Sequence, residues 1–317
     1  MKFNNIIKPI AFISIFFIIL SILSLFFLKE TPKNDIGFEE KNTIDYLVIG
    51  DSEAYTSISP MEIWNKYGFT GYNLGVPGQR LQKTYYSLKK VLKNQKPKVI
   101  MLETNSAYRV FGVYEETNKI LRSILENNFA VYKYHNRWKK FNFINNKKAN
   151  ANINKSKTNI LKGFRYNNKV KPYIKGSYVK ETDIIEKINE IPMYYLNKIV
   201  KLCNENNIRL ILYTSPSPVN WNYKKHNGIE VFAKENKLPL LDLNLKNDEL
   251  KIDWLKDTYD KGDHLNFSGA KKVTNYIGNY LAKNTNLIDH RQDKKYESWN
   301  DLWKKYLKII NKGLNKK

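Results

Sequence analysis

The chain has 317 residues, and 42% of them are hydrophobic, which is enough for the core of one α/β domain of roughly 250 residues with appended segments. Because the chain has a single cysteine, Cys203, a disulfide framework and a cysteine-rich metal site are excluded. Cys203 falls in a helical apolar pattern, which is typical of a packing residue. The formal net charge of +24 would suit a nucleic-acid partner. The apolar N-terminus indicates export and argues against that partner.

The N-terminus contains a span of 19 residues, positions 10–28, that carries no charge. As a helix this span would be about 28 Å long, close to the hydrocarbon thickness of a bilayer. Lys2 and Lys8 precede it, which favours an N-in orientation with the rest of the chain outside the cell membrane. A cleaved signal peptide is the alternative, but no small-x-small cleavage site follows the span. We therefore expect residues 1–43 to form a single-pass anchor and its spacer.

The first expected strand is the uninterrupted apolar run at 46–49, which leads into Gly50, Asp51 and Ser52. A run of this kind is typical of a strand that is buried on both faces of a parallel sheet. Further strands are expected at 71–74, 99–102, 209–213 and 238–241, and helices at 60–67, 81–92, 192–204, 228–235 and 268–281. This alternation predicts an α/β fold over residues 44–283, a three-layer α/β/α sandwich with a central parallel sheet of about five strands.

Two segments fall outside the alternating pattern. Residues 108–180 read as an insertion, partly helical near 120–134 and flexible around 145–158, and positions 133–171 hold twelve Lys or Arg and no acid. Outside a membrane such a basic segment would meet anionic lipid head groups or wall polymers, although a plain solvated surface is equally compatible. The tail at 284–317 carries Trp299 and Trp303, which predict a helix docked on the domain or, alternatively, an interfacial helix.

Polar residues with complementary chemistry follow the expected strands. Ser52 follows the first strand, Gly78 a turn after the second, Asn105 the third, and His264 lies in a loop just before the last helix. A serine nucleophile needs a base, a carboxylate that orients the base, and donors for the developing oxyanion. Ser52 would be the nucleophile and His264 the base, a neighbouring Asp would orient the base, and Ser52, Gly78 and Asn105 are the oxyanion candidates. The alternatives are a capping turn at Asp51 and a packed core histidine at position 264.

These blocks resemble the SGNH (GDSL-type) hydrolase superfamily over residues 45–105 and 208–281. The resemblance implies a flavodoxin-like fold, Ser52 as nucleophile, His264 as base, and an oxyanion hole completed by Gly78 and Asn105. Asn73 and Gly78 have the Asn-x4-Gly spacing of the second block. Glu53 departs from the pattern because it stands where the commonest motif has leucine.

The acid that would orient His264 is ambiguous. The usual Asp-x-x-His spacing of the superfamily would place it at position 261, which is Lys261. Asp263, adjacent to the histidine, and Asp260, four residues before it, are the two candidates. We take Asp263 first, although adjacent side chains meet only where the loop bends sharply.

The expected function is that of a membrane-anchored, extracytoplasmic serine esterase or O-acyltransferase that acts through an acyl-enzyme on cell-envelope carbohydrate. The anchor and the Asp-His-Leu-Asn ending resemble a branch of the superfamily that includes DltD-like and alginate-acetylation proteins. That resemblance implies an acylated surface polymer as substrate and a multi-spanning membrane acyltransferase as partner. No cofactor or metal is expected, because the histidines and carboxylates lack ligand spacing. The alternative is a non-catalytic polymer- or partner-binding protein on a decayed hydrolase scaffold.

Overall fold

The computed structural model describes residues 4–28, 36–109, 118, 121–122, 124–126, 128–133 and 159–315. The chain divides into two compact units, Met1–Asp35 with Phe111–Lys157, and Ile36–Val110 with Thr158–Lys317. The predicted flexible stretch at 145–158 lies outside the described residues.

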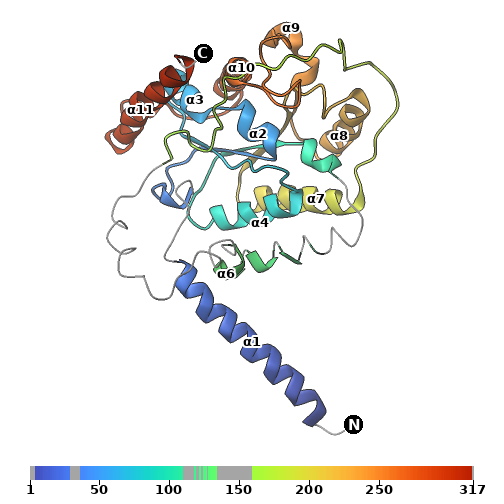
Figure 1. Ribbon diagram of the computed structural model, residues 1–317, viewed down its shortest axis with the longest axis vertical. Coiled ribbons are helices and arrows are strands. Elements are labelled where there is room, and N and C mark those ends of the chain that lie inside the picture. The colour runs from blue at the N-terminus through green and yellow to red at the C-terminus, as the bar shows by residue number, and fades with distance from the viewer. Residues whose placement is uncertain are drawn as a thin grey trace. The chain divides into compact units, whose positions relative to one another are not determined.

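A parallel sheet of five strands forms the centre of the second unit (Figure 1). The strands are β1 (Tyr46–Ile49), β2 (Gly71–Asn73), β3 (Val99–Glu103), β4 (Arg209–Thr214) and β5 (Leu240–Asp242), in the order β2-β1-β3-β4-β5. All neighbouring pairs within this sheet are parallel. The order is that of doubly wound, flavodoxin-like sheets, in which ligands bind beyond the carboxyl ends of the strands. The predicted α/β fold is confirmed.

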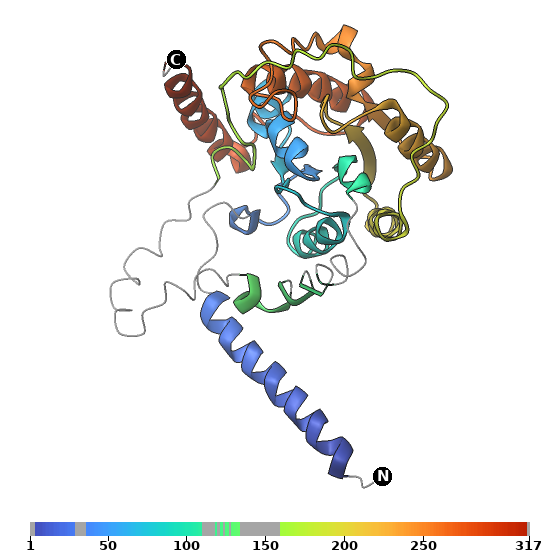
Figure 2. The same ribbon diagram turned by 45° about the vertical axis from the view of Figure 1, so that its right-hand side comes forward.

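Helices cover both faces of the sheet. On one face α4 (Leu81–Val91) and α7 (Glu190–Glu205) lie side by side (Figures 1 and 2). On the other, α10 (Phe267–Asn284) packs on α2 (Ser52–Ser57) and α3 (Pro60–Tyr67). All residues of β1 and β3 are buried, as expected for strands covered on both faces.

The helix boundaries agree with the expected ones to within a few residues, except at α8 (Tyr223–Glu235). This helix begins five residues before the expected position 228, because the Asn222 side chain caps it by accepting a hydrogen bond from the Lys225 N–H at 3.0 Å. At α3, Pro60 occupies the first turn, and Gly68 ends the helix with φ of +71°. Short elements described in the second unit are α9 (Asn247–Leu250) and 3-10 helices at Ile36–Phe38, Asn105–Tyr108, Leu243–Leu245 and Lys294–Tyr296.

The C-terminal tail docks on the domain through α11 (Glu297–Leu314), which packs against α3. Trp299 is buried, and its ring lies 5.2 Å from that of Trp64. Tyr306 is also buried, and its hydroxyl lies 3.1 Å from the Ser59 hydroxyl. Of the two predictions for the tail, a docked helix and an interfacial helix, the structure contains the docked helix.

In the first unit, α1 (Asn4–Leu28) contacts the short α6 (Ala130–Lys133). Most described positions between 118 and 133 are helical, as expected for this part of the insertion. Within α1, the segment Ile7–Leu25 is long and apolar enough to cross a membrane. Signal sequences meet the same criterion of length and composition. Residues 159–180 of the insertion belong to the second unit.

Candidate active site

The nucleophile candidate begins α2 directly after the end of β1. Asp51 caps this helix, because its Oδ1 accepts a hydrogen bond from the Glu53 N–H at 3.1 Å. Gly50 has φ of +153°, and a Cβ there would lie 2.6 Å from the Cβ of Glu103 at the end of β3. A larger residue would separate the two strand ends, so glycine is required for the close approach. Ser52 is 7% exposed at this edge of the sheet.

The second block holds the nucleophile loop in place. The Asn73 side chain at the end of β2 donates hydrogen bonds to the carbonyl oxygens of Ala54 at 2.8 Å and Ile58 at 3.0 Å. Its Oδ1 accepts the N–H of Gly75 at 3.0 Å. Gly78 follows in an exposed turn with φ of +60°. Asn73 thus ties the loop after β2 to α2 and to the residue that follows α2.

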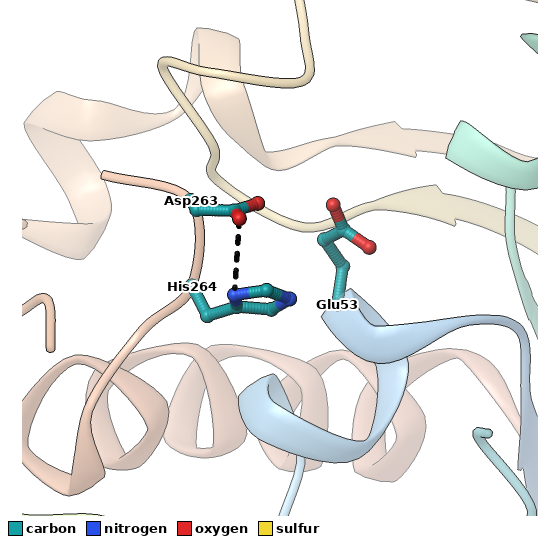
Figure 3. Close-up of side chains that lie close together, drawn as sticks. All are labelled: Glu53, Asp263 and His264. Atoms are coloured by element: carbon teal, nitrogen blue, oxygen red, sulfur yellow. Dashed lines mark ion pairs between the residues drawn. The ribbon is translucent and has the colours of Figure 1, made fainter. Parts of the chain in front are cut away.

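His264 is oriented by Asp260. The His264 Nδ1 lies 2.6 Å from Asp260 Oδ2, and the His264 backbone N–H donates to Asp260 Oδ1 at 2.7 Å. Asp263 Oδ2 is farther, 3.6 Å from the same Nδ1 (Figure 3). Lys261 has φ of +66° and Gly262 φ of +91°, and these two left-handed residues turn the chain tightly enough for Asp260 to reach back. Asp260 is therefore within hydrogen-bond distance of the His264 Nδ1, whereas Asp263, the acid that we placed first, is not.

The two ring nitrogens of His264 have different surroundings. The Nε2 atom is buried and has no hydrogen-bond partner among the described residues, whereas Nδ1 faces the Asp260 carboxylate. This pairing favours the tautomer with the proton on Nδ1, which leaves a lone pair on Nε2. The ring stacks on Tyr259, with the ring centroids 5.6 Å apart.

Glu53 extends from α2 toward the histidine loop. One oxygen of Glu53, one oxygen of Asp263 and one ring nitrogen of His264 lie within 4.8 Å of one another (Figure 3). The Ser52 hydroxyl donates to Glu53 Oε2 at 3.3 Å. In this arrangement the serine hydroxyl is therefore paired with a carboxyl group rather than with the imidazole.

Asn105 also contacts these acids. Its side-chain amide donates to Glu53 Oε1 at 3.1 Å and, more weakly, to Asp51 Oδ2 at 3.4 Å. Its backbone N–H donates to both oxygens of Glu103 at 3.1 Å. Asn105 is 5% exposed just after the end of β3, and its amide contacts the two residues that flank Ser52 in the chain.

Arg109 forms ion pairs with two members of an acid cluster that consists of Asp51, Glu53 and Glu103. Its Nε donates to Asp51 Oδ2 at 2.6 Å, and its Nη2 lies 3.6 Å from Glu53 Oε2. Burial raises the pKa of Glu53 well above its ordinary value, and the charge of Asp51 raises it further. Burial, followed by the Asp51 charge, also raises the pKa of Glu103. At Asp51, burial is outweighed by hydrogen bonding with Glu53 and by Arg109, so its pKa is lowered.

Among the residues that the structure describes, two sets of side chains have atoms close enough together to hold a metal ion, namely Glu53–Asp263–His264 and Asp51–Glu53–Glu103. The Asn220 side-chain amide donates to one oxygen of Glu53 and to one of Asp263 in the first set. Arg109 is bound to the second set. Protein donors therefore already bind these carboxyl groups, and the expectation of a metal-free site stays a prediction.

Asn220 and Arg109 are site residues that the sequence analysis missed. Asn220 lies in the loop after β4, 167 positions from Glu53 along the chain. It is held there by its backbone carbonyl, which accepts a hydrogen bond from Lys225 Nζ at 2.8 Å. Neither residue belongs to a recognisable motif, because an asparagine and an arginine in loops are common at protein surfaces.

No family model matches the chain, and no curated protein matches it. Among solved structures, it is similar to a psychrotrophic esterase from Pseudoalteromonas, with 10% identity, a TM-score of 0.39, and coverage of 75% of this chain and 97% of that one. A GDSL-like lipase from Bacteroides thetaiotaomicron is 12% identical, with a TM-score of 0.35 and coverage of 80% and 92%. A lipase/acylhydrolase from Enterococcus faecalis is 12% identical, with a TM-score of 0.39 and coverage of 76% and 96%. Similarity at this level assigns neither a family nor an activity to the chain.

Proposed function

We propose that the chain is a serine esterase or O-acyltransferase of the SGNH (GDSL-type) superfamily, anchored in the cell membrane and acting on cell-envelope carbohydrate. The observation that best supports this proposal is the difference between the two ring nitrogens of His264 in their hydrogen bonding. Its Nδ1 is bound to Asp260 at 2.6 Å, while its buried Nε2 has no partner among the described residues. A buried, unsatisfied ring nitrogen is costly, and a catalytic base is one of the few roles that explains it.

In the proposed reaction, the Ser52 Oγ attacks the carbonyl carbon of an ester while His264 Nε2 takes the hydroxyl proton. Asp260 stabilises the imidazolium that forms. The imidazolium then protonates the leaving alcohol, and an acyl-enzyme remains on Ser52. For this step the Ser52 hydroxyl turns from Glu53 toward the imidazole, since catalytic hydrogen bonds are often loose before substrate binds. Water or a sugar hydroxyl accepts the acyl group in the second half of the reaction.

The cellular part of the proposal is supported by features outside the site. The apolar helix α1 would act as the anchor, with the second unit outside the membrane. The basic stretch at 133–171 would approach an anionic surface polymer. A multi-spanning membrane acyltransferase would supply or receive the acyl group if the reaction is a transfer.

Labelling with a fluorophosphonate probe tests the chemistry. Full-length protein in detergent should be labelled on Ser52, and both Ser52→Ala and His264→Ala should abolish or nearly abolish labelling. His226→Ala is the matched control, because His226 also pairs with an aspartate, Asp242, at 2.9 Å but lies on α8 outside the site. If wild type is labelled and Ser52→Ala is labelled to the same extent, the proposal is refuted.

The non-catalytic alternative is favoured by one observation, namely that the Ser52 hydroxyl is bound to Glu53 rather than to His264. A protein of that kind would not label. Replacing Ser52 with alanine in the cell would then leave acylation of the envelope polymer unchanged, whereas the esterase or transferase would alter it.

A further inference from the structure

The Glu53 carboxyl group lies among the donors that the proposed reaction requires for a substrate. Its Oε2 accepts the hydroxyl of Ser52, the proposed nucleophile, at 3.3 Å. Its Oε1 accepts the side-chain amide of Asn105, the proposed oxyanion donor, at 3.1 Å. A carboxyl group and an ester share a planar carbon that carries two oxygens. The group therefore has the shape and the partners of the ester that Ser52 would attack.

Further contacts hold the carboxyl group there. Oε1 also accepts a hydrogen bond from the Asn220 amide, and Oε2 lies 3.6 Å from Arg109 Nη2. A ring nitrogen of His264 lies within 4.8 Å. Glu53 is 2% exposed, so solvent does not share this position with it.

The position is costly for an acid, which argues against a purely structural role. Glu53 is buried beside two other acids, Asp51 and Glu103, and Arg109 forms ion pairs with only Asp51 and Glu53 among the three. Burying several carboxyl groups together destabilises a fold unless each is well paired. The remaining donors, from Ser52, Asn105 and Asn220, are groups that a bound ester could use equally well.

We propose that Glu53 is a gating residue of the acyl site: in the resting protein its carboxyl group occupies the place of the substrate ester, and Ser52 is acylated only after that group moves away. The inference rests on the proposed function. It has a specific consequence: Ser52 of the wild-type protein should be acylated more slowly than Ser52 of a variant that lacks the Glu53 carboxyl group. The apparent affinity for any acylating reagent is reduced by the fraction of molecules in which Glu53 occupies the site.

The test is the second-order rate constant for labelling of Ser52 by a fluorophosphonate, measured on full-length protein in detergent. In that reaction the Ser52 oxygen bonds to phosphorus, fluoride leaves with the bonding pair, and the serine proton passes to His264. Glu53→Leu removes the polar atoms while keeping a side chain of similar size. Because the carboxyl group accepts three hydrogen bonds of modest net strength, we expect labelling to be on the order of ten- to a hundredfold faster.

Two further variants complete the comparison. Asp45→Asn is the matched control, because Asp45 is a buried acid at the opposite end of β1 that pairs with His290 at 2.7 Å. Its labelling rate should stay within about twofold of wild type, since it contacts no group of the site. Glu53→Ala removes the same atoms without new bulk, and it replaces the leucine variant if thermal unfolding shows that the leucine variant does not fold.

The outcomes separate this inference from the proposed function. Faster labelling of Glu53→Leu or Glu53→Ala supports the gate, and labelling of these variants alone, with wild type inert, supports it most strongly. Wild-type labelling that is lost in Ser52→Ala but not accelerated in folded Glu53 variants overturns the gate and leaves the proposed function standing. If neither wild type nor any folded Glu53 variant labels, the proposed function fails and the gate fails with it.

Discussion

Asp260 and His264 are joined twice, through Oδ2 to the ring Nδ1 at 2.6 Å and through Oδ1 to the backbone N–H at 2.7 Å. The two contacts fix both the position of the histidine and the rotation of its ring. An acid that holds only the side chain would leave the loop free to move. The pair therefore acts as one rigid unit on the loop before α10.

The first prediction follows from this pair. Asp260→Asn should lower the rate of Ser52 labelling on the order of a thousand- to ten-thousandfold, because an amide favours the wrong imidazole tautomer. Asp263→Asn should lower it less than about tenfold, because its oxygen lies 3.6 Å from Nδ1 and makes no hydrogen bond to it. The rate constants for probe labelling of the two variants decide between the acids. A larger loss for Asp263→Asn would contradict the assignment.

The second prediction concerns Asn105. Asn105→Ala should reduce labelling about a hundredfold, since one oxyanion donor typically contributes about 3 kcal/mol to stabilisation of the transition state. Asn105 also holds the Glu53 carboxyl group, so the substitution should be repeated in the Glu53→Leu background, where only the catalytic contribution remains. Asn206→Ala, at the exposed end of α7, is the control. An unchanged rate in the double variant would exclude Asn105 from the oxyanion hole.

The third prediction concerns stability and pH at Glu103. Because its pKa is raised in the folded protein, the folded state holds this proton more tightly than the unfolded state. Its contribution to stability is therefore fully present below the ordinary glutamate pKa and is lost as the pH rises toward the folded-state pKa. Glu103→Gln should make the free energy of unfolding less dependent on pH above about 4.3.

Denaturant unfolding at several pH values between about 4 and 8 measures this dependence. Glu205→Gln is the control, since the Glu205 side chain is 56% exposed. The same pH dependence in wild type and Glu103→Gln would show that Glu103 does not hold a proton in the folded state.

The fourth prediction concerns a buried lysine. Lys162 is fully buried, its Nζ lies 2.8 and 2.7 Å from the two carboxyl oxygens of Glu39, and it sits 4.0 Å above the Trp299 ring. Lys162→Met should lower the free energy of unfolding by about 3–5 kcal/mol, because it leaves Glu39 buried without its partner. Adding Glu39→Gln should recover part of that loss.

Thermal or denaturant unfolding of the single and double variants measures this coupling. Lys201→Met is the control, because the Lys201 side chain is 77% exposed in its pair with Glu205. A double variant as unstable as the sum of the two single variants would mean that the pair is not coupled.

The fifth prediction concerns the anchor. N-terminal sequencing of protein purified from membranes should begin before residue 10, and a start beyond residue 28 would show cleavage. For topology, Lys283→Cys should react with a membrane-impermeant maleimide in intact cells. The native Cys203 should contribute little background, because it is buried and burial raises the pKa of its thiol to about 12. Reaction only after the cells are opened would reverse the proposed orientation.

Local patterns in the sequence were sufficient to predict the strands and helices of the fold. They also predicted the edge of the sheet at which the candidate site residues lie. Uninterrupted apolar runs such as 46–49 are typical of strands covered on both faces, and Pro60 and Gly68 bound a helix through their own backbone preferences. Because parallel strands end at a common edge, Ser52 and Asn105 could be placed together before any contact was known. These inferences depend on residues close together in the chain.

Only the tertiary structure decided which groups touch one another at that edge. The choice between Asp260 and Asp263 depended on the left-handed backbone at Lys261 and Gly262, which no spacing rule encodes for a lysine. The contact between Asn220 and Glu53 joins loops 167 positions apart, and its existence depends on the path of both loops. The raised pKa of Glu53 likewise follows from burial and from the neighbouring Asp51, which are properties of the packed site rather than of the chain.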